Sequence, residues 1–392
     1  MFAPLAPHRD TERRFAGARM LIDWVQMMEA APQPAFETPL LALHKSEGAS
    51  IGTWFGCALP DRFDSWLGEY HAARETVALI DKNYRAYLQF TGPDRVRYLN
   101  AILTNNVKDL RIGHGVLSLF LNPQGRIQAE IETYATPDSL WCVSYAMIRK
   151  TLVPALDKYI IMDDVTLADE SENWGTLALE GPLAATVTKE LAGVDLADVE
   201  ELAFREAQVE GIFCVLVKRS PMGIAGTELR ARRGDLEALW KTLRQAVTSA
   251  GGQPMGYQAL SALRLEQGVP WFGYDFSDRQ IPHEAGLEDS HISYSKGCYT
   301  GQEIVERVRS RGQVNRVRAL LAIGGQAPPA SGTSLLADGR ESGHVTRSAF
   351  SPALQSAIAM AYIRREDSAS GSELACGADQ ARVIAPPLAA GS

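Results

Sequence analysis

The spacing of apolar residues predicts an ordered series of helices and strands from Leu40 onward. Between residues 62 and 79, apolar side chains recur every three or four positions, as on one face of a helix. Residues 86–90 predict a strand, and Thr91-Gly92-Pro93-Asp94 after it suits a helix start, because Thr91 or Asp94 can cap a helix. The other predicted elements are a hairpin of 116–121 and 127–134, strands at 140–144, 176–179, 213–217 and 227–231, and helices at 148–161, 184–191 and 236–250.

A second Gly-Pro turn indicates that this pattern is repeated. Glu180-Gly181-Pro182-Leu183 also stands between a predicted strand and a predicted helix. Two such units predict a duplicated α+β fold, each with an antiparallel sheet and helices on one face. After about residue 312, short strands separated by Gly, Pro and Ser predict a small β-barrel or sandwich. The predicted fold class is therefore α+β twice, then all-β.

Composition and charge narrow the function classes. The 392 residues are 46% hydrophobic and 22% charged, which is typical of a globular protein of two or three domains. The net charge of −8 does not favour a protein that coats nucleic acid or an anionic membrane. No apolar run is long enough for a membrane helix, and Arg13-Arg14-Phe15 lacks the apolar stretch of a twin-arginine signal. We expect a cytoplasmic protein whose residues 1–39 form an extension with a short helical pattern at 21–28.

The cysteines are few and odd in number. They are Cys57, Cys142, Cys214, Cys298 and Cys376, and none forms a C-x-x-C pair. Such a set fits a reducing compartment and excludes a disulfide framework or a self-contained zinc site. No metal site is predicted.

The segment around Cys298 is the first candidate for chemistry. Cys298 stands between Gly297 and Gly301 and two residues from Lys296. The Lys296 ammonium, or the amides of a following helix, would lower the thiol pKa and supply the reactive thiolate. Gln302 and Glu303 are expected in the first turn of that helix. Two other interpretations stay open: a free Cys is usually a small buried apolar residue, and the glycines can form a simple turn.

Arginines and aromatic residues supply further candidates. In an extended segment, Arg307, Arg309 and Arg311 would project to one face and suit a polyanion such as a poly-carboxylate tail or phosphate. A solvated linker is the alternative. The aromatic run within 271–276 can form a wall for a flat heterocycle or part of the core. Arg264 and Glu266, two apart on a predicted helix, can be ligands or a surface pair.

These motifs resemble a known family. The segment 296–303, followed by arginines and Arg311-Gly312, resembles the signature of the YgfZ family. These are folate-binding proteins similar to the glycine-cleavage T-protein (aminomethyltransferase), and they are implicated in the assembly or repair of certain iron–sulfur enzymes. The similarity to the T-protein superfamily extends from about Leu40 to Leu388 through blocks at 91–94, 103–107, 263–268, 282–287 and 343–354.

The resemblance implies a three-domain cloverleaf with tetrahydrofolate in a central hole. The implied domains are 40–84 with 170–257, then a folate-binding domain of 85–169 with 258–312, and a barrel of 313–392. Cys298 and Lys296 would carry the chemistry. The implied folate contacts are Glu130, Arg264, Glu266, Tyr274, Tyr299, Gln302, Glu303 and Arg309. Partners would be folate and iron–sulfur client or assembly proteins, and the chain would be a monomer.

Departures from the T-protein pattern bear on the choice of subfamily. T-proteins carry an acidic pair after the first hairpin glycine, where this chain has Ala129 and Glu130. Their Tyr-Thr-Gly-Glu block corresponds to residues 221–224, with Ile224 at the glutamate position. A pterin N–H left unpaired there would cost about 1–3 kcal/mol. The prediction is therefore a YgfZ-like protein, with a tetrahydrofolate-dependent aminomethyl- or methyltransferase as the alternative, since residues 263–287 and the barrel stay close to T-proteins.

Overall fold

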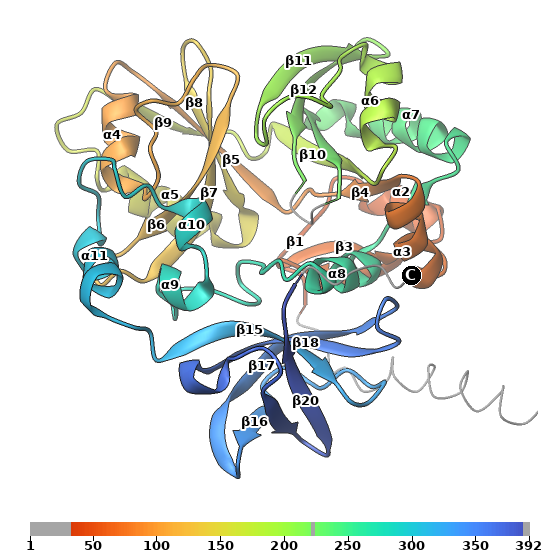
Figure 1. The fold of residues 1–392 in the computed structure, drawn as a ribbon. Coiled ribbons are helices and arrows are strands. Elements are labelled where there is room, and N and C mark those ends of the chain that lie inside the picture. Colours follow the sequence, from red (N-terminus) through yellow and green to blue (C-terminus); the bar gives the residue numbers. More distant parts are fainter. Residues whose placement is uncertain (1–32, 221–223, 387–392) are drawn as a thin grey trace, which may run out of the picture.

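Three β-sheets and one closed barrel form the fold in the computed structural model, which describes residues 33–220 and 224–386. In Figure 1 two sheet-and-helix units lie side by side above the barrel, and a short sheet with helix α8 (Tyr257–Glu266) lies between them. The predicted class of two α+β units followed by an all-β domain is confirmed. The predicted helix at 21–28 lies outside the described residues.

One unit holds a five-stranded antiparallel sheet in the order β6-β7-β8-β5-β9. Its elements are β5 (Arg85–Thr91), α4 (Arg95–Ile102), β6 (Gly115–Leu121), β7 (Ile127–Ala135), β8 (Leu140–Tyr145), α5 (Arg149–Asp157) and β9 (Thr166–Asp169). The predicted strands and the hairpin here are confirmed, because alternate apolar residues of these strands pack against both helices. The second predicted helix is shorter than expected and ends at Asp157.

The other unit holds a six-stranded sheet in the order β11-β12-β13-β10-β4-β14. Its elements are β4 (Ala78–Asp81), β10 (Trp174–Glu180), α6 (Ala184–Ala192), β11 (Phe204–Val209), β12 (Ile212–Lys218), β13 (Gly226–Arg232), α7 (Leu236–Ser249) and β14 (Gln253–Pro254). Strand β4 precedes the whole five-stranded sheet in the chain, yet it pairs with β10 and β14. The chain segments of the two units therefore interleave, while the exact domain bounds stay a prediction.

The two Gly-Pro turns have the same structural cause. A Cβ at Gly92 would lie 2.2 Å from the carbonyl oxygen of Asp164, and one at Gly181 would lie 2.5 Å from that of Thr76. Both glycines also have positive φ, so the close carbonyl oxygen and the backbone conformation each exclude a side chain at these positions. The predicted cap by Asp94 is wrong, because its carboxylate accepts the N–H of Asp164 and not one of helix α4.

The C-terminal unit is a closed barrel in the order β15-β18-β17-β16-β19-β20. Its strands are β15 (Arg316–Ile323), β16 (Ser334–Ala337), β17 (Arg340–Ser351), β18 (Ser356–Arg364), β19 (Glu373–Cys376) and β20 (Asp379–Ile384). Small and branched side chains fill its interior, which confirms the predicted barrel. The register of β17 on β18 shifts between Val345 and Arg347, so β17 carries a bulge there.

A small sheet and several helices join the three units. They are β1 (Phe36–Glu37), α2 (Leu41–Ser46), β2 (Ser50–Trp54), β3 (Cys57–Arg62) and α3 (Trp66–Glu75). The helix predicted over 62–79 is therefore only α3, because the segments on either side belong to strands β3 and β4. Nine of the ten residues of α8 are buried, so this helix is the central core element.

The segment after α8 contains short helices and one longer helix. These are α9 (Pro282–Ala285), α10 (Glu288–His291) and α11 (Gln302–Arg311). The extended arginine segment predicted at 307–311 is wrong, because Gly301 at φ +82° turns the chain into α11. Ion pairs along this helix, Glu303 to Arg307 and Glu306 to Arg309, support the helical form. Among the described residues, no helix is both long and apolar enough to cross a membrane.

Candidate functional site

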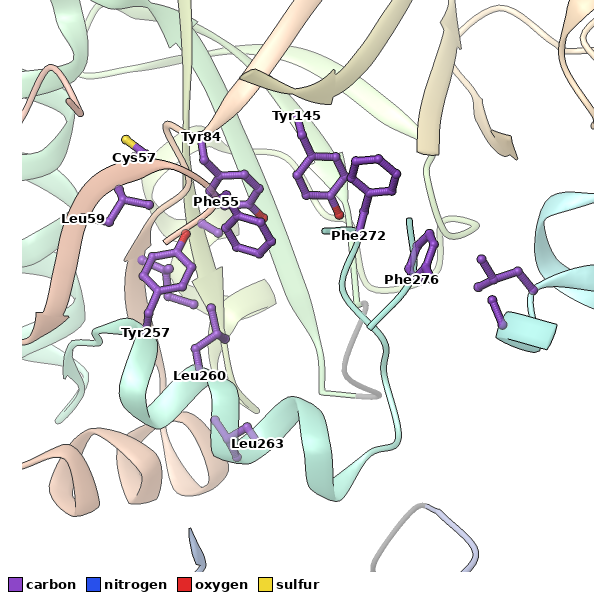
Figure 2. Packing of buried hydrophobic residues seen from close by; sticks show 14 of the residues in the cluster. Phe55, Cys57, Leu59, Tyr84, Tyr145, Tyr257, Leu260, Leu263, Phe272 and Phe276 are labelled. Atoms are coloured by element: carbon purple, nitrogen blue, oxygen red, sulfur yellow. The ribbon is translucent and has the colours of Figure 1, made fainter. Parts of the chain in front are cut away.

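Aromatic rings gather where the three units meet. Figure 2 shows Phe55, Tyr84, Tyr145, Tyr257 and Phe272 converging from different elements, and each of these side chains is buried. The ring centroids of Phe55 and Tyr84 lie 4.2 Å apart in a stacked pair, and those of Tyr145 and Phe272 lie 5.2 Å apart. We call this cluster the aromatic centre; it is part of the hydrophobic core, and its rings pack in the offset and edge-on pairs that aromatic side chains favour.

Phe55 occupies the middle of the aromatic centre. It lies at the tip of the β2–β3 hairpin with φ +53°, and Gly56 after it has φ +72°. A bulky residue at positive φ is strained and persists only where its surroundings hold it. Here the Phe55 N–H donates to the Tyr274 hydroxyl at 2.9 Å, and its ring contacts those of Tyr84 and Trp271.

A carboxylate lies at the edge of this centre. Glu130 on β7 accepts a hydrogen bond from the Tyr145 hydroxyl at 2.8 Å, and its other oxygen lies 3.0 Å from Nε2 of His291. Burial alone would raise the pKa of Glu130, but the interactions with His291 and with Tyr145 outweigh it and lower that pKa. Glu130 is therefore an ionised hydrogen-bond acceptor at the edge of the aromatic centre.

The strand alternation explains where Glu130 points. Ala129 and Ile131 face the core beneath the helices of the five-stranded sheet. Glu130 and Glu132 therefore project from the opposite face, toward the rest of the molecule. His291 is positioned from the other side, because its carbonyl oxygen accepts the Thr104 hydroxyl at 2.7 Å.

A buried network of charges lies beside Glu130, between the two large sheets. Its members are Lys82, Arg85, Glu132, Glu180, Arg219, Glu228 and Arg230. Arg85 bridges Glu132 and Glu228 at 3.0 Å each, and its guanidinium lies over the rings of Tyr84 and Tyr145. Burial raises the pKa of the carboxylates, but the neighbouring cations dominate and lower the pKa of Glu228 to about 2. The ion pairs hold these charged side chains in place next to the aromatic centre.

Arg264, predicted to bind folate, is fully buried on α8. Its Nη1 donates to the Val269 carbonyl and to Asp275, and its guanidinium lies 4.5 Å from the Trp271 ring centroid. Its Nε and Nη2 atoms have no hydrogen-bond partner in the described residues. The idea of a surface pair with Glu266 is wrong, because both side chains have no exposed surface.

Glu266 connects helix α8 with helix α3 and with the barrel. Its two oxygens accept from Tyr70 at 2.7 Å, Arg74 at 3.1 Å and Ser351 at 2.6 Å, and from the N–H of Ala353. These donors come from α3 and from the end of β17. Since they use up the carboxylate, the expectation that Glu266 contacts folate gives way to a structural role.

Among the described residues, no hydrogen bond or ion pair joins the segment around Cys298 to Glu130. Cys298 is exposed, whereas the other four cysteines are buried and free. Lys296 donates to the carbonyl oxygens of Asn100 and Leu103 at the end of α4, and burial lowers its pKa to about 8. Its ammonium is therefore engaged by a helix end, and among the described residues no hydrogen bond joins it to Cys298. The expected support of a thiolate by Lys296 is not what this geometry provides.

The remaining predicted contacts divide into two groups. Tyr274 contacts the aromatic centre at Phe55, through its hydroxyl and its ring. Tyr299 is buried, its hydroxyl has no hydrogen-bond partner within the described ranges, and its N–H donates to the Gln302 side chain. Glu303 and Arg309 lie on α11 in local ion pairs, with the Glu303 side chain 83% exposed. We see no contact of these α11 residues with Glu130 or Arg264 in the described part of the chain.

The structure adds residues that the sequence did not single out. His291, Tyr145 and Phe55 are the chief ones, and Arg347 on β17 is a fourth. His291 carried no signal beyond being a lone histidine, and Tyr145 lies one residue beyond the predicted strand at 140–144. A surface hollow lined by Asn106, Asp109, Leu110, Arg111, His114, Gly115, Val116 and Glu200 is separate, because it shares no lining residue with the candidate site.

Two interleaved α+β units, a β-barrel after them and a partly buried carboxylate beside the aromatic centre define a class of protein that family comparisons identify. Residues 40–291 match the GCVT N-terminal domain, and residues 316–388 match the glycine cleavage T-protein C-terminal barrel domain. Because the first match covers more than half of the chain, the chain belongs to the glycine cleavage T-protein superfamily.

Individual relatives agree with this assignment. The chain is 28% identical over 337 residues to an aminomethyltransferase of Streptomyces avermitilis, covering 85% of this chain and 91% of the relative. It is 29% identical over 358 residues to an aminomethyltransferase of Geobacillus, and the match covers 90% of this chain and 98% of that relative. A solved glycine cleavage system aminomethyltransferase T from Bartonella henselae has a TM-score of 0.81 at 23% identity, covering 90% of this chain and 97% of that one, and thus shares its fold.

Proposed function

We propose that the chain binds a reduced folate at the aromatic centre and transfers a one-carbon group, aminomethyl or methyl, there. The observation that carries this proposal is the ionised Glu130, which His291 and Tyr145 hold at the edge of the aromatic rings. The names of the relatives, which are aminomethyltransferases, support this reaction class over the alternative below.

The residues present fit a reduced folate in chemical type. Glu130 can accept hydrogen bonds from the adjacent N–H groups of a pterin edge, since each carboxylate oxygen keeps a free lone pair. The rings of Tyr84, Tyr145 and Trp271 offer stacking surfaces for the heterocycle. A bound heterocycle would take the place of the Phe55 ring, so binding requires the β2–β3 hairpin tip to move.

The same residues suit one-carbon transfer. A reduced folate would supply the nitrogen that accepts or releases the one-carbon group. Glu130, kept ionised among apolar rings, would stabilise positive charge that develops on nitrogen during transfer. His291 and the Tyr145 hydroxyl hold the Glu130 carboxylate in orientation. Because Ala129 replaces the first acidic residue of T-proteins, Glu130 is the carboxylate that this function would use.

Turnover tests this proposal. The chain with tetrahydrofolate should release product from an aminomethyl or methyl donor, and Glu130→Gln should lower kcat by about 100-fold or more. Glu237→Gln, an exposed carboxylate on α7 in an ion pair with Lys241, is the matched control and should keep full activity. Absence of turnover with every glycine-derived and methoxy donor would remove the transferase proposal.

A second candidate rests on Cys298. Of the five cysteines, Cys298 is the exposed one, and it lies in the segment that resembles the YgfZ signature. We propose, as the alternative, a YgfZ-like role in iron–sulfur cluster assembly or repair in the cytoplasm, with a client protein as partner. One thiolate cannot hold a cluster alone, so a partner would supply the other ligands. Cys298→Ala should then abolish function in cells while folate binding persists, and an unchanged phenotype would end this candidate.

A further inference from the structure

Arg347 lies at one end of the aromatic centre. The bulge in β17 places its guanidinium 4.4 Å from the centroid of the Tyr274 ring and 5.5 Å from that of Trp54. Within residues 33–220 and 224–386, this half-buried side chain has no hydrogen bond and no ion pair. Stacking on a ring uses the face of a guanidinium and leaves its N–H donors, which point outward in the plane, available to a ligand.

The charge around Arg347 favours an anion. Asp275 is bound by Arg264 and by the hydroxyl of Thr346, the neighbour of Arg347. Burial, with a further contribution from the Arg347 charge, lowers the pKa of Arg264, so the two cations are close enough to interact. Nε and Nη2 of Arg264 are also buried and find no hydrogen-bond partner in the part of the chain that the structure describes. The Asp275 carboxylate is engaged by Arg264, by the Trp271 N–H and by Thr346, whereas within the described residues no carboxylate pairs with Arg347, so its positive charge is left over at this end of the site.

A continuous series of rings connects this end with Glu130. The Tyr145 hydroxyl binds Glu130, the rings of Tyr145 and Phe55 lie 5.4 Å apart, and those of Phe55 and Tyr274 lie 5.0 Å apart. Arg347 covers the far ring. The site thus presents a carboxylate, a row of aromatic rings and a cation in that order. A complementary ligand has N–H donors at one end, an aromatic middle and an anionic tail.

We infer that Arg347 is the subsite for a carboxylate of the glutamate tail of a reduced folate, with the pterin toward Glu130. This inference rests on the proposed function and adds the ligand's orientation. It also replaces the expected polyanion site at 307–311, since Arg307 and Arg309 are paired with glutamates on α11. Arg347 is here a binding residue and has no part in the chemical step.

A comparison of two ligands tests the inference. Tetrahydrofolate and tetrahydropterin, which lacks the aminobenzoyl-glutamate part, are titrated into the full chain and into Arg347→Gln. Loss of a hydrogen-bonded charge pair should weaken tetrahydrofolate binding by about tenfold or more, while tetrahydropterin binding stays unchanged. Added salt should weaken tetrahydrofolate binding to the unchanged chain and have little effect on the variant.

Controls separate the outcomes. Arg382→Gln, an exposed arginine on β20 of the same barrel, should bind tetrahydrofolate like the unchanged chain. Arg347→Lys, which keeps the charge without the planar fork, should bind with intermediate affinity and serves if Arg347→Gln does not fold. Equal tetrahydrofolate affinity for the unchanged chain and Arg347→Gln, or equal losses for both ligands, would overturn the inference. If the unchanged chain binds neither ligand, the proposed function itself fails.

Discussion

Glu130 and Glu132 are two residues apart on β7 and share one face, yet their neighbours give them different roles. Glu132 is bound by three arginines of the buried network. Glu130 is bound only by the imidazole of His291 and the hydroxyl of Tyr145 among the described side chains. The sequence allowed Glu130 to be predicted as a site residue, because it follows the hairpin glycine in a recognisable block. Its partner His291 could not be predicted, since it comes from a helix 161 positions later in the chain.

Cys298 should be the one rapidly reacting thiol. Its side chain is exposed, whereas burial raises the pKa of Cys142 and of Cys214 to about 12 and suppresses their thiolates. We expect one thiol per chain to react quickly with a disulfide reagent under native conditions. The other four should react only after unfolding, and Cys298→Ala should abolish the fast phase. A fast phase that survives in Cys298→Ala would contradict the described burial.

Phe55→Ala should trade stability for ligand affinity. The ring is 1% exposed and contacts several other rings, so its removal should lower the free energy of unfolding by about 3–5 kcal/mol. Affinity for tetrahydrofolate should rise, because no ring has to be displaced. Urea unfolding and ligand titration measure the two effects. Phe213→Ala, a half-exposed ring on β12, is the control, and equal stability losses in both variants would argue against the packing at Phe55.

At the level of elements, helix α8 connects the units through Glu266. This carboxylate joins α8 to α3 and to the barrel strand β17, so Glu266→Gln leaves Arg74 without its charge partner. We expect a loss of about 3 kcal/mol in the free energy of unfolding, measured in urea. Glu303→Gln on the exposed face of α11 should have little effect. If both variants have the same stability, Glu266 does not link the units.

Local sequence patterns predicted some elements better than others. The hairpin of β6 and β7 was predictable, because apolar alternation flanks an Asn-Pro-Gln-Gly turn. The start of helix α11 at Gln302 was expected, but its continuation through Arg307–Arg311 was not, since that part is rich in arginine and is held in helical form by ion pairs with Glu303 and Glu306. The pairing of β4 with β10 was also beyond local pattern, because nearly a hundred residues separate the two strands.

At the level of the whole molecule, the buried charge network joins the two large sheets and should make stability depend on pH. The pKa of Glu132 is held well below 4.5 and that of Glu228 at about 2, mainly by cations that outweigh burial. Because these folded pKa values lie below the unfolded ones, the stabilisation is present above about pH 4.5 and is lost as pH falls toward about 2. Glu132→Gln should reduce this slope in urea unfolding between about pH 6 and about pH 3. An identical slope would show that the network does not carry the effect.

The overall class was predictable because the duplicated Gly-Pro turns and the family-like blocks spread over most of the chain. The packing of rings at the aromatic centre was not predictable, since Phe55, Tyr145 and Trp271 come from three separate parts of the sequence. Arg347 also escaped prediction, because its orientation depends on a bulge that the strand pattern does not show.

Binding of tetrahydrofolate is the measurement that tests the central claim most directly. Trp54 and Trp271 lie against the aromatic centre, so their fluorescence should report occupancy. We predict saturable binding of one tetrahydrofolate per chain, weakened by about tenfold or more in Glu130→Gln. No saturable binding, or equal affinity in the unchanged chain and in Glu130→Gln, would contradict the account.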